Sequence, residues 1–351
     1  MKIVEVENLR GDEVLANPIL TDDYQVLMGK GTRIKKEYIE KLKELDISEV
    51  YIEEYFDIKD RESNVLKEEI KESCVSRIKG VLEKHTYNNN AELQKISKVA
   101  ETIICDILEN TNVIDKVYEI KERGADIYEH SISVCTLATI VGIKLGMEKE
   151  LLYDIGMASL LHDLGLRYIV VPYKNAEIET LSEKDAEEYR KHTIYGYTAI
   201  VHENWLSDRA KKMILFHHEK KSGTGYPLRA NDITLECQVI SICEAFDELL
   251  CGVGKKRVKV HEAIEYLKMV RDVEYDATVV DALMKFTAVF PTGTTVRLSD
   301  MSVGMVVKQS EHFPERPVIR LMKDKNGKLC EEEVLVDLVL IHNIVIEEVI
   351  D

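Results

Sequence analysis

The chain has 351 residues, of which 45% are apolar, and a formal net charge of -17 at pH 7, so it is long enough for two or three domains with a buried core. The negative charge disfavours nucleic acid polymers and anionic membranes as partners, although bound metal ions could still attract a small anionic ligand. No apolar run is long enough to cross a bilayer and the N-terminus lacks the apolar stretch of a signal peptide, so we expect a cytoplasmic protein.

Residues 1–57 are predicted to form a small α+β module. Short apolar segments such as KIVEV and YQVLMG are separated by turn signals, and the helical pattern KKEYIEKLKELD precedes a last strand, SEVYI. Residues 58–66 are charged and poor in apolar side chains, which is typical of a linker.

Residues 67–289 have a helical period, with apolar side chains three and four positions apart. In SISVCTLATIVGIKL these side chains form one stripe, and His130 lies one turn before the stripe on the same face. In LLYDIGMASLLHDLG, Gly165 is a natural helix stop. The pattern therefore predicts a bundle of helices.

After Phe290-Pro291 the pattern changes to short alternating runs such as TTVRLS, GMVVKQS and PVIRLM, separated by turn signals. We expect residues 290–351 to form a small β domain. The predicted fold class is therefore mainly α: a helical bundle flanked by a small N-terminal α+β module and a small C-terminal β domain.

Histidines and acids recur along the predicted bundle at intervals of about one helix and its connection. Side chains spaced in this way can come from different helices and converge inside a bundle. Imidazole and carboxylate together suit iron, manganese or zinc. One of these histidines alone could be a hydrogen-bonded core or surface residue, but the ordered set indicates a metal site. Its members are His130, His162, Asp163, His192, His217, His218 and Glu244.

Three acids in or near this set have alternative interpretations. Glu244 lies among apolar neighbours in VISICEAFDELL, where a carboxylate needs a cation or solvent at a helix edge. Asp247, one turn later, is more readily a partner of a ligand or a structural acid than a ligand itself. Asp126 would share a helical face with His130 and could add a carboxylate, or it could be a solvated acid near the helix start.

These residues resemble the HD-GYP family, a branch of the HD phosphohydrolases, over roughly residues 120–285. The resemblance implies an HD-type helical bundle that holds two or three divalent metal ions, commonly iron or manganese. It also implies hydrolysis of the bacterial second messenger cyclic di-GMP to pGpG or GMP. The elements that match the family in order and approximate spacing are His130, His162-Asp163, His192, His217-His218 and Gly225-Tyr226-Pro227.

Carried over residue by residue, the resemblance implies that the histidines of this set and Asp163 ligate metals, with His162 and Asp163 as the catalytic pair. Glu244 would be a ligand where the family usually has aspartate. Asp126 stands where some members supply a carboxylate for a third metal. Gly225, Tyr226 and Pro227 would bring backbone close to the ligand, fix the loop and line the base or phosphate pocket.

Two departures from the family pattern bear on activity, and the first of them removes a lysine that contacts a phosphate in the family. The lysine of the HDxGK motif is replaced by Leu166, and Ser222 stands where the loop before GYP normally has aspartate. Arg167, Lys255 or Lys256 could contact phosphates instead, although a solvated face is the alternative interpretation for each of them.

These residues and motifs are compatible with three functions. The first is a metal-dependent phosphodiesterase that hydrolyses cyclic di-GMP by metal-activated hydroxide. The second is a catalytically impaired sensor that binds the nucleotide or only the metals and signals through its flanking domains. The third is hydrolysis of another phosphorylated nucleotide. Since helical bundles of this kind often pair, we also expect a homodimer.

Other kinds of site have little support in the sequence. It contains no GxxxxGKS/T phosphate-binding loop and no GxSxG nucleophile elbow. The seven cysteines are scattered without a CxxC pair, which indicates buried thiols rather than disulfides or a zinc finger.

Overall fold

The computed structural model describes most of the chain. The described residues are 2–11, 13–16, 18–20, 26–29, 31–45, 47–52, 66, 68–84, 92–109, 117–310, 312–330 and 332–350. The predicted linker at residues 58–66 lies outside these ranges, apart from Leu66. Contacts divide the chain into two units, Met1–Arg61 with Glu122–Gly124 and Glu62–Lys121 with Ala125–Asp351.

The first unit is an α+β module. β1 (Lys2–Glu5) pairs antiparallel with β4 (Glu49–Ile52), β2 (Ile19–Leu20) pairs antiparallel with β3 (Val26–Met28), and α1 (Lys36–Glu44) precedes β4 in the chain. Its core contains Leu15, Ile34, Ile39, Leu42 and Val50. Ile39 and Leu42 lie three positions apart, so the helix buries one face against this core.

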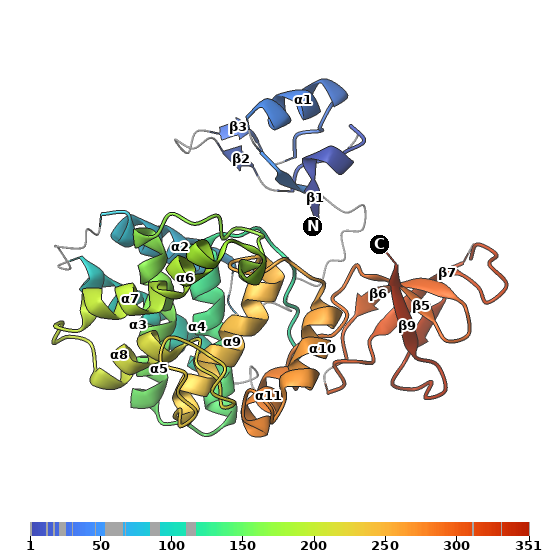
Figure 1. The fold of residues 1–351 in the computed structure, drawn as a ribbon. Coiled ribbons are helices and arrows are strands. Elements are labelled where there is room, and N and C mark those ends of the chain that lie inside the picture. Colours follow the sequence, from blue (N-terminus) through green and yellow to red (C-terminus); the bar gives the residue numbers. More distant parts are fainter. Residues whose placement is uncertain are drawn as a thin grey trace. The chain divides into compact units, whose positions relative to one another are not determined.

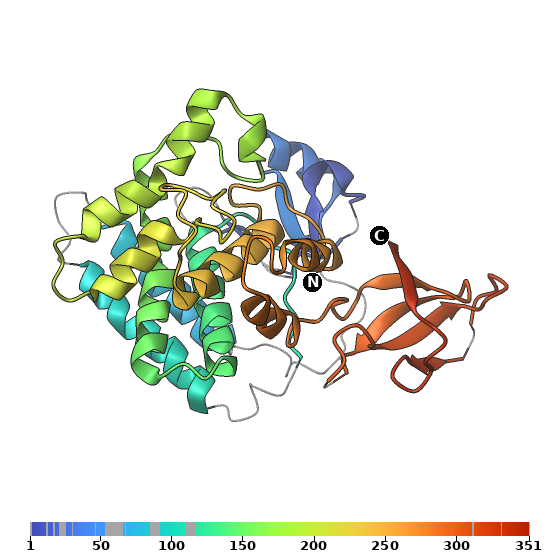
Figure 2. The same ribbon diagram turned by 60° about the horizontal axis from the view of Figure 1, so that its bottom comes forward.

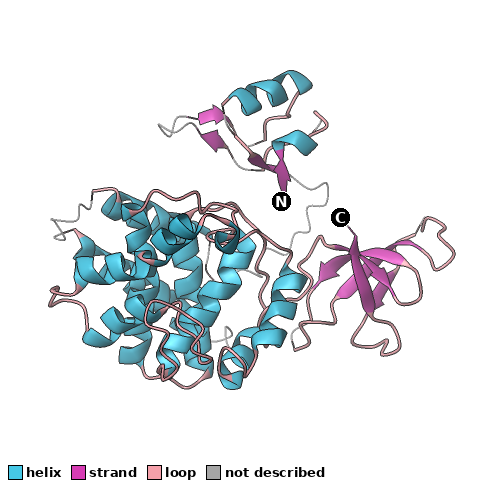
Figure 3. Cartoon of the chain, in the orientation of Figure 1, coloured by secondary structure: helices cyan, strands magenta, loops and turns pink. Residues whose placement is uncertain are grey.

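The second unit contains the helical domain, shown from two directions in Figures 1 and 2. In the described part of the chain, strands belong to the N-terminal module and the C-terminal domain, and the region between them is helical (Figure 3). The helices are α2 (Glu68–Leu82), α3 (Ser97–Glu109), α4 (Ile127–Lys144), α5 (Lys149–Leu161), α6 (Glu183–Arg190), α7 (His192–Ile200), α8 (Asp208–Phe216), α9 (Leu235–Cys251), α10 (Val260–Val270) and α11 (Ala277–Met284).

The helix α4 lies at the centre of this bundle, where it packs against α2, α3, α5, α9 and α11. Its residues from 134 to 142 are all buried, and a helix that is apolar on most sides belongs in the interior. Asp126 caps its N-terminus by accepting hydrogen bonds from the backbone N–H groups of Tyr128 and Glu129. Because His130 lies in the first turns of a buried helix, its imidazole is inside the protein.

The structure differs from the sequence prediction at the end of α5. The sequence predicts a helix stop at Gly165, but α5 ends at Leu161 and His162–Tyr168 form a 3-10 helix. A methyl group at Gly165 would lie 1.8 Å from the carbonyl oxygen of His192. The glycine therefore allows this segment to pack against the start of α7, a close approach that helical periodicity does not reveal.

The C-terminal part of the second unit is an antiparallel sheet of five strands in the order β8-β7-β6-β5-β9. The strands are β5 (Thr295–Leu298), β6 (Val303–Lys308), β7 (Val318–Lys323), β8 (Leu335–Asp337) and β9 (Ile346–Ile350). Val296, Leu298, Val306 and Ile319 are part of its core. The predicted fold class is confirmed. Among the described residues, no helix combines the length and hydropathy needed to span a membrane.

Candidate metal centre

Five segments of the helical domain bring the predicted ligands together. His130 lies in α4, His162 and Asp163 follow α5 directly, His192 begins α7, His217 and His218 follow α8, and Glu244 lies in the middle of α9. The side chains of His130, His162, His192, His217 and Glu244 are at most 1% exposed. The histidines and acids selected from the sequence therefore form one buried cluster in the described structure.

Asp163 lies among three imidazoles of this cluster. Its Oδ2 is 3.4 Å from Nε2 of His162 and 3.6 Å from Nε2 of His130, and its Oδ1 is 3.4 Å from Nε2 of His192. The imidazoles are also close to one another: the Nε2 atoms of His130 and His162 are 3.2 Å apart, and those of His192 and His217 are 3.0 Å apart.

Glu244 joins the remaining ligands from the other side of the cluster. Its Oε1 is 3.0 Å from Nε2 of His218, 3.6 Å from Nε2 of His217 and 4.0 Å from Nε2 of His162. Ligand atoms of several triples lie within 4.8 Å of one another. Such triples include His192 with His217 and His218, His130 with His162 and Glu244, and Asp163 with His217 and Glu244.

The other ring nitrogen of each buried histidine fixes the ring orientation. Nδ1 of His162, His192 and His217 lies 2.7 Å from the carbonyl oxygen three residues earlier in each case. Because a carbonyl can only accept, Nδ1 carries a proton, and in its neutral form each ring presents the lone pair of Nε2 to the cluster. Nδ1 of His130 is instead 2.7 Å from Oδ2 of Asp247, a carboxylate–histidine pair typical of metal sites. Asp247 thus occupies the partner position that the sequence favours for it.

Several ligand atoms are buried without a hydrogen bond. They are both carboxylate oxygens of Asp163, Oε2 of Glu244 and Nε2 of His218. A buried polar group that lacks a partner costs about 1 to 3 kcal/mol, and a charged group costs more. Since nitrogen lone pairs also face one another across about 3 Å, the cluster needs positive charge at its centre.

The pKa shifts follow from this same burial. Burial, followed by the neighbouring imidazoles, lowers the pKa of His217 and His218 well below the usual value. Burial, followed by the nearby carboxylates, raises the pKa of Glu244 well above its usual value. Burial therefore disfavours the charged forms of these three groups, whereas for His162 and Asp163 burial is outweighed by their mutual attraction, which raises the pKa of His162 and lowers the pKa of Asp163. The nitrogen and oxygen donors fit a divalent iron, manganese or zinc ion.

The loop after His218 is built around Glu219, a residue that the sequence motifs do not single out. Glu219 is buried, and its carboxylate accepts hydrogen bonds from the backbone N–H groups of Leu228 at 2.6 Å and Ala230 at 2.9 Å. The sequence offers a signal for this role, because an acid that directly follows His217 and His218 and precedes a loop broken by glycines can accept hydrogen bonds from the backbone of that loop.

Gly225 and Tyr226 hold the same loop against His218. A methyl group at Gly225 would lie 2.4 Å from the carbonyl oxygen of His218, so the close approach requires glycine. The ring of Tyr226 stacks on the imidazole of His218 with the centroids 4.4 Å apart. The predicted role of Gly225, Tyr226 and Pro227 in substrate binding remains a prediction, and the stacking contact that the structure shows for Tyr226 is with His218.

The basic residues selected from the sequence lie outside these ligand groups. Arg167 donates to the Tyr128 hydroxyl at 3.4 Å, Lys256 is exposed, and Lys255 forms ion pairs with Glu177 at 2.9 Å and with Glu179. Leu166, at the position of the family lysine, is 3% exposed and belongs to an apolar cluster with Ile169, Val171 and Ile178. Phosphate binding by Arg167, Lys255 or Lys256 remains a prediction.

Asp126 also lies outside the ligand groups found among the described residues. It is exposed, and its Oδ1 caps α4 at 2.8 Å from the backbone nitrogen of Tyr128 and 3.0 Å from that of Glu129. This geometry matches the alternative interpretation of a solvated acid at the helix start. Its assignment as a metal ligand remains a prediction.

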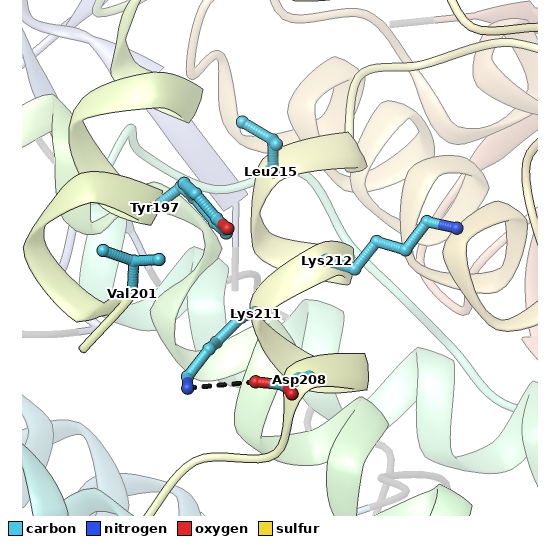
Figure 4. Close-up of a pocket in the computed structure, with 6 residues that line it drawn as sticks. All are labelled: Tyr197, Val201, Asp208, Lys211, Lys212 and Leu215. Atoms are coloured by element: carbon cyan, nitrogen blue, oxygen red, sulfur yellow. Dashed lines mark hydrogen bonds and ion pairs between the residues drawn. The ribbon is translucent and has the colours of Figure 1, made fainter. Parts of the chain in front are cut away.

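A pocket of about 150 Å³ lies apart from this ligand set, on α7 and α8 (Figure 4). Nζ of Lys211 and Oδ1 of Asp208 form an ion pair at 3.2 Å in its wall. The volume is below the roughly 300 to 1,000 Å³ typical of sites for small organic molecules. The pocket lining consists of Tyr197, Val201, Asp208, Lys211, Lys212 and Leu215.

Comparisons with known proteins agree with this geometry. Residues 108–279 match the HD domain family, and residues 295–351 match a KOW domain that is associated with HD domains. A cyclic di-GMP phosphodiesterase of Pseudomonas aeruginosa is 25% identical over 246 residues, which are 69% of this chain and 59% of that protein. The cyclic di-GMP phosphodiesterase PdeB of Borreliella burgdorferi is 26% identical over 58% of this chain and 54% of its own length. The matched region thus spans between half and two thirds of these relatives.

A solved structure, an HDG"Y"P protein from Bdellovibrio bacteriovorus, has the same fold. It superimposes with a TM-score of 0.54 and 20% sequence identity, over 80% of this chain and 97% of that protein. The helices that supply the ligands lie inside residues 108–279, the region that matches the HD domain family. Residues 108–279 of this chain thus match an HD domain, as the motifs predicted, and residues 295–351 match a KOW domain that accompanies HD domains.

Proposed function

We propose that this chain is a metal-dependent phosphodiesterase that hydrolyses cyclic di-GMP to pGpG, GMP or both. The ligands would hold two or three divalent ions, with iron or manganese favoured by the mixed imidazole and carboxylate donors. The curated relatives named as cyclic di-GMP phosphodiesterases support the substrate class.

One observation carries the proposal. Asp163, Glu244 and His218 bury ligand atoms without hydrogen bonds, in a cluster where the Nε2 atoms of neighbouring imidazoles lie 3.0 to 3.2 Å apart. Such an arrangement is unstable unless cations bind in it. Divalent metals held there would supply a nucleophilic oxygen at neutral pH and offset the negative charge of a phosphodiester.

The protein's own residues would orient this chemistry. Asp247 and the three backbone carbonyls fix the imidazole rings, so the ligands are arranged before substrate arrives. The side chain of His218 is 12% exposed, whereas those of His217 and Glu244 are at most 1% exposed. A phosphodiester would therefore approach on the His218 side, beside the loop that contains Tyr226.

A specific observation favours the sensor as a second candidate. The side chain at the position of the family lysine, Leu166, is buried in an apolar cluster, and Lys255 is already paired with Glu177 and Glu179. Fewer cations are then free to bind the phosphates, which would weaken stabilisation of the transition state more than metal binding. Metal or nucleotide binding could survive in such a protein without turnover.

The test is to prepare the full chain anaerobically with Fe²⁺ or Mn²⁺, measure bound metal by elemental analysis, and incubate it with cyclic di-GMP. The products are separated by liquid chromatography against pGpG and GMP standards. His162→Ala should remove metal and abolish turnover. His202→Ala replaces an exposed histidine outside the cluster and should change neither quantity.

Each outcome selects one function. Bound metal with release of pGpG or GMP supports the phosphodiesterase. Bound metal and nucleotide affinity without turnover would favour the sensor, and turnover of a different nucleotide would favour the third function. A chain that holds no metal under these conditions, or a His162→Ala variant with unchanged metal content, would refute the proposal.

A further inference from the structure

Glu248 is a buried acid that the sequence motifs do not include. It lies one turn after Glu244 on α9 and is 5% exposed. Residues four apart on a helix share a face, so both carboxylates point to the same side. Ligand atoms of Glu248, Glu244 and His218 lie within 4.8 Å of one another.

The rest of this triple points to a ligand independently of Glu248. Oε2 of Glu244 is buried without a hydrogen bond, and so is Nε2 of His218, which lies 3.0 Å from the other carboxylate oxygen of Glu244. The Glu244 side chain is 1% exposed, so water cannot readily serve its oxygen. Two of the three members thus have unsatisfied ligand atoms beside a third buried carboxylate.

The neighbours of Glu248 offset its charge only in part. Its Oε1 accepts a long hydrogen bond of 3.4 Å from the Tyr189 hydroxyl. Lys255 acts on Glu248 electrostatically, but its amine is held at 2.9 Å by Glu177 and at 3.4 Å by Glu179. Two buried carboxylates four residues apart, beside the imidazole of His218, repel each other in their charged forms, and a cation between them would relieve that repulsion.

We propose that His218, Glu244 and Glu248 hold an additional divalent cation of the cluster. In this arrangement Glu248, rather than Asp126, supplies the supporting carboxylate. Asp126 is exposed and its Oδ1 is occupied by two backbone N–H groups, whereas Glu248 is buried among ligand atoms. Two carboxylates and one imidazole suit manganese or ferrous iron. The inference rests on the proposed metal-dependent function and adds a residue and a site to it.

The test counts Mn²⁺ ions on the full chain. Apo protein is prepared with a chelator, titrated with Mn²⁺ by calorimetry, and analysed for bound metal after desalting. Glu248→Gln keeps the size of the side chain and its contact with Tyr189 while it removes the charge. We expect it to lose about one equivalent of Mn²⁺ per chain relative to wild type. Asp126→Asn should keep the wild-type number.

A matched control is available on the same helix. Glu236 lies in the first turn of α9, outside the ligand groups of the described structure, so Glu236→Gln should bind Mn²⁺ like wild type. The rise in melting temperature on adding Mn²⁺ gives a second measurement, which should be smaller for Glu248→Gln than for wild type and Glu236→Gln. Circular dichroism of the apo proteins checks that all variants are folded.

The outcomes separate this inference from the proposed function. Wild-type Mn²⁺ content and thermal response in Glu248→Gln would overturn the inference while the function stands. If Asp126→Asn instead of Glu248→Gln bound one ion fewer, Asp126 would be the supporting carboxylate, and the inference about Glu248 would be overturned. A wild-type chain that binds no Mn²⁺ would remove both the function and the inference.

Discussion

Substitution of Gly165 by alanine tests whether the close contact of the 3-10 helix with α7 holds the cluster together. The added methyl group would lie 1.8 Å from the carbonyl oxygen of His192, 2.6 Å from its carbonyl carbon and 2.8 Å from the backbone nitrogen of Gly196. All three are backbone atoms, so no side chain can rotate away and the two segments must separate. The change would move Asp163 away from His192, since each lies within three residues of the contact.

The expected loss of folding stability follows from the overpacking at Gly165. Extra methyl groups in a packed interior cost about 1 to 3 kcal/mol, and backbone contacts this short belong at the upper end. For a domain of this size, each kcal/mol lowers the melting temperature by about 2 to 4 °C, so Gly165→Ala should melt about 6 to 12 °C below wild type. It should also bind less Mn²⁺, because two ligands are displaced.

The control is Gly80→Ala in the last turn of α2. An added methyl group there meets no atom within 4 Å, and alanine favours a helix over glycine by about 0.5 to 1 kcal/mol. This variant should melt at or slightly above the wild-type temperature with full metal content. The reasoning fails if Gly165→Ala keeps both the melting temperature and the Mn²⁺ content of wild type, when both are measured by calorimetry beside Gly80→Ala.

Three further changes test other parts of the site. Asp247→Asn should weaken metal binding about 10 to 100-fold in a chelator competition, because it removes the charge that orients His130; an unchanged affinity would argue against that role. Glu219→Ala should lower the free energy of unfolding by about 1 to 3 kcal/mol, because the N–H groups of Leu228 and Ala230 lose their acceptor. Amide hydrogen exchange in that loop should then be faster than in wild type, and an equal exchange rate would contradict this prediction. Lowering the pH should release metal, because protons compete with it for the same nitrogen and oxygen atoms. The melting temperature of metal-loaded protein should fall over the same pH range in which the metal is lost. A melting temperature that does not depend on bound metal at any pH would count against the site.

The fold was predictable because its determinants are local. Apolar periodicity marked the helices and the change to short alternating runs marked the C-terminal sheet, and the fold class is confirmed. The boundaries proposed at residues 57, 67 and 290 remain predictions. The 3-10 helix after α5 was not predictable, because the close contact at Gly165 depends on where α7 lies in space.

The sequence predicted which residues gather in the cluster better than it predicted how they are arranged. The spacing of histidines and acids indicated that they converge, but a one-dimensional pattern contains no distances. Glu248 was overlooked although it is the fourth residue after Glu244 in an apolar helix, where a second acid on the same face is unexpected. Asp126 likewise lies four residues from His130, but it precedes α4 and caps the N-terminus of that helix. Helical spacing alone therefore cannot distinguish a buried acid from a capping one.

The way in which the rings are oriented explains why this bundle suits cations in particular. The carbonyls that fix His162, His192 and His217 belong to Ser159, Tyr189 and Ile214, which lie in the last turns of α5, α6 and α8. Carbonyls at the end of a helix lack partners within the helix, so each can accept from an imidazole at no cost to the helix. Three helix C-termini, each with partial negative charge, thus lie at the cluster, together with the N-terminal turns of α4 and α7, which supply His130 and His192. The short step from helix end to histidine sets the orientation of each ring, and removal of metal would leave the ring nitrogens and carboxylates of the cluster facing one another.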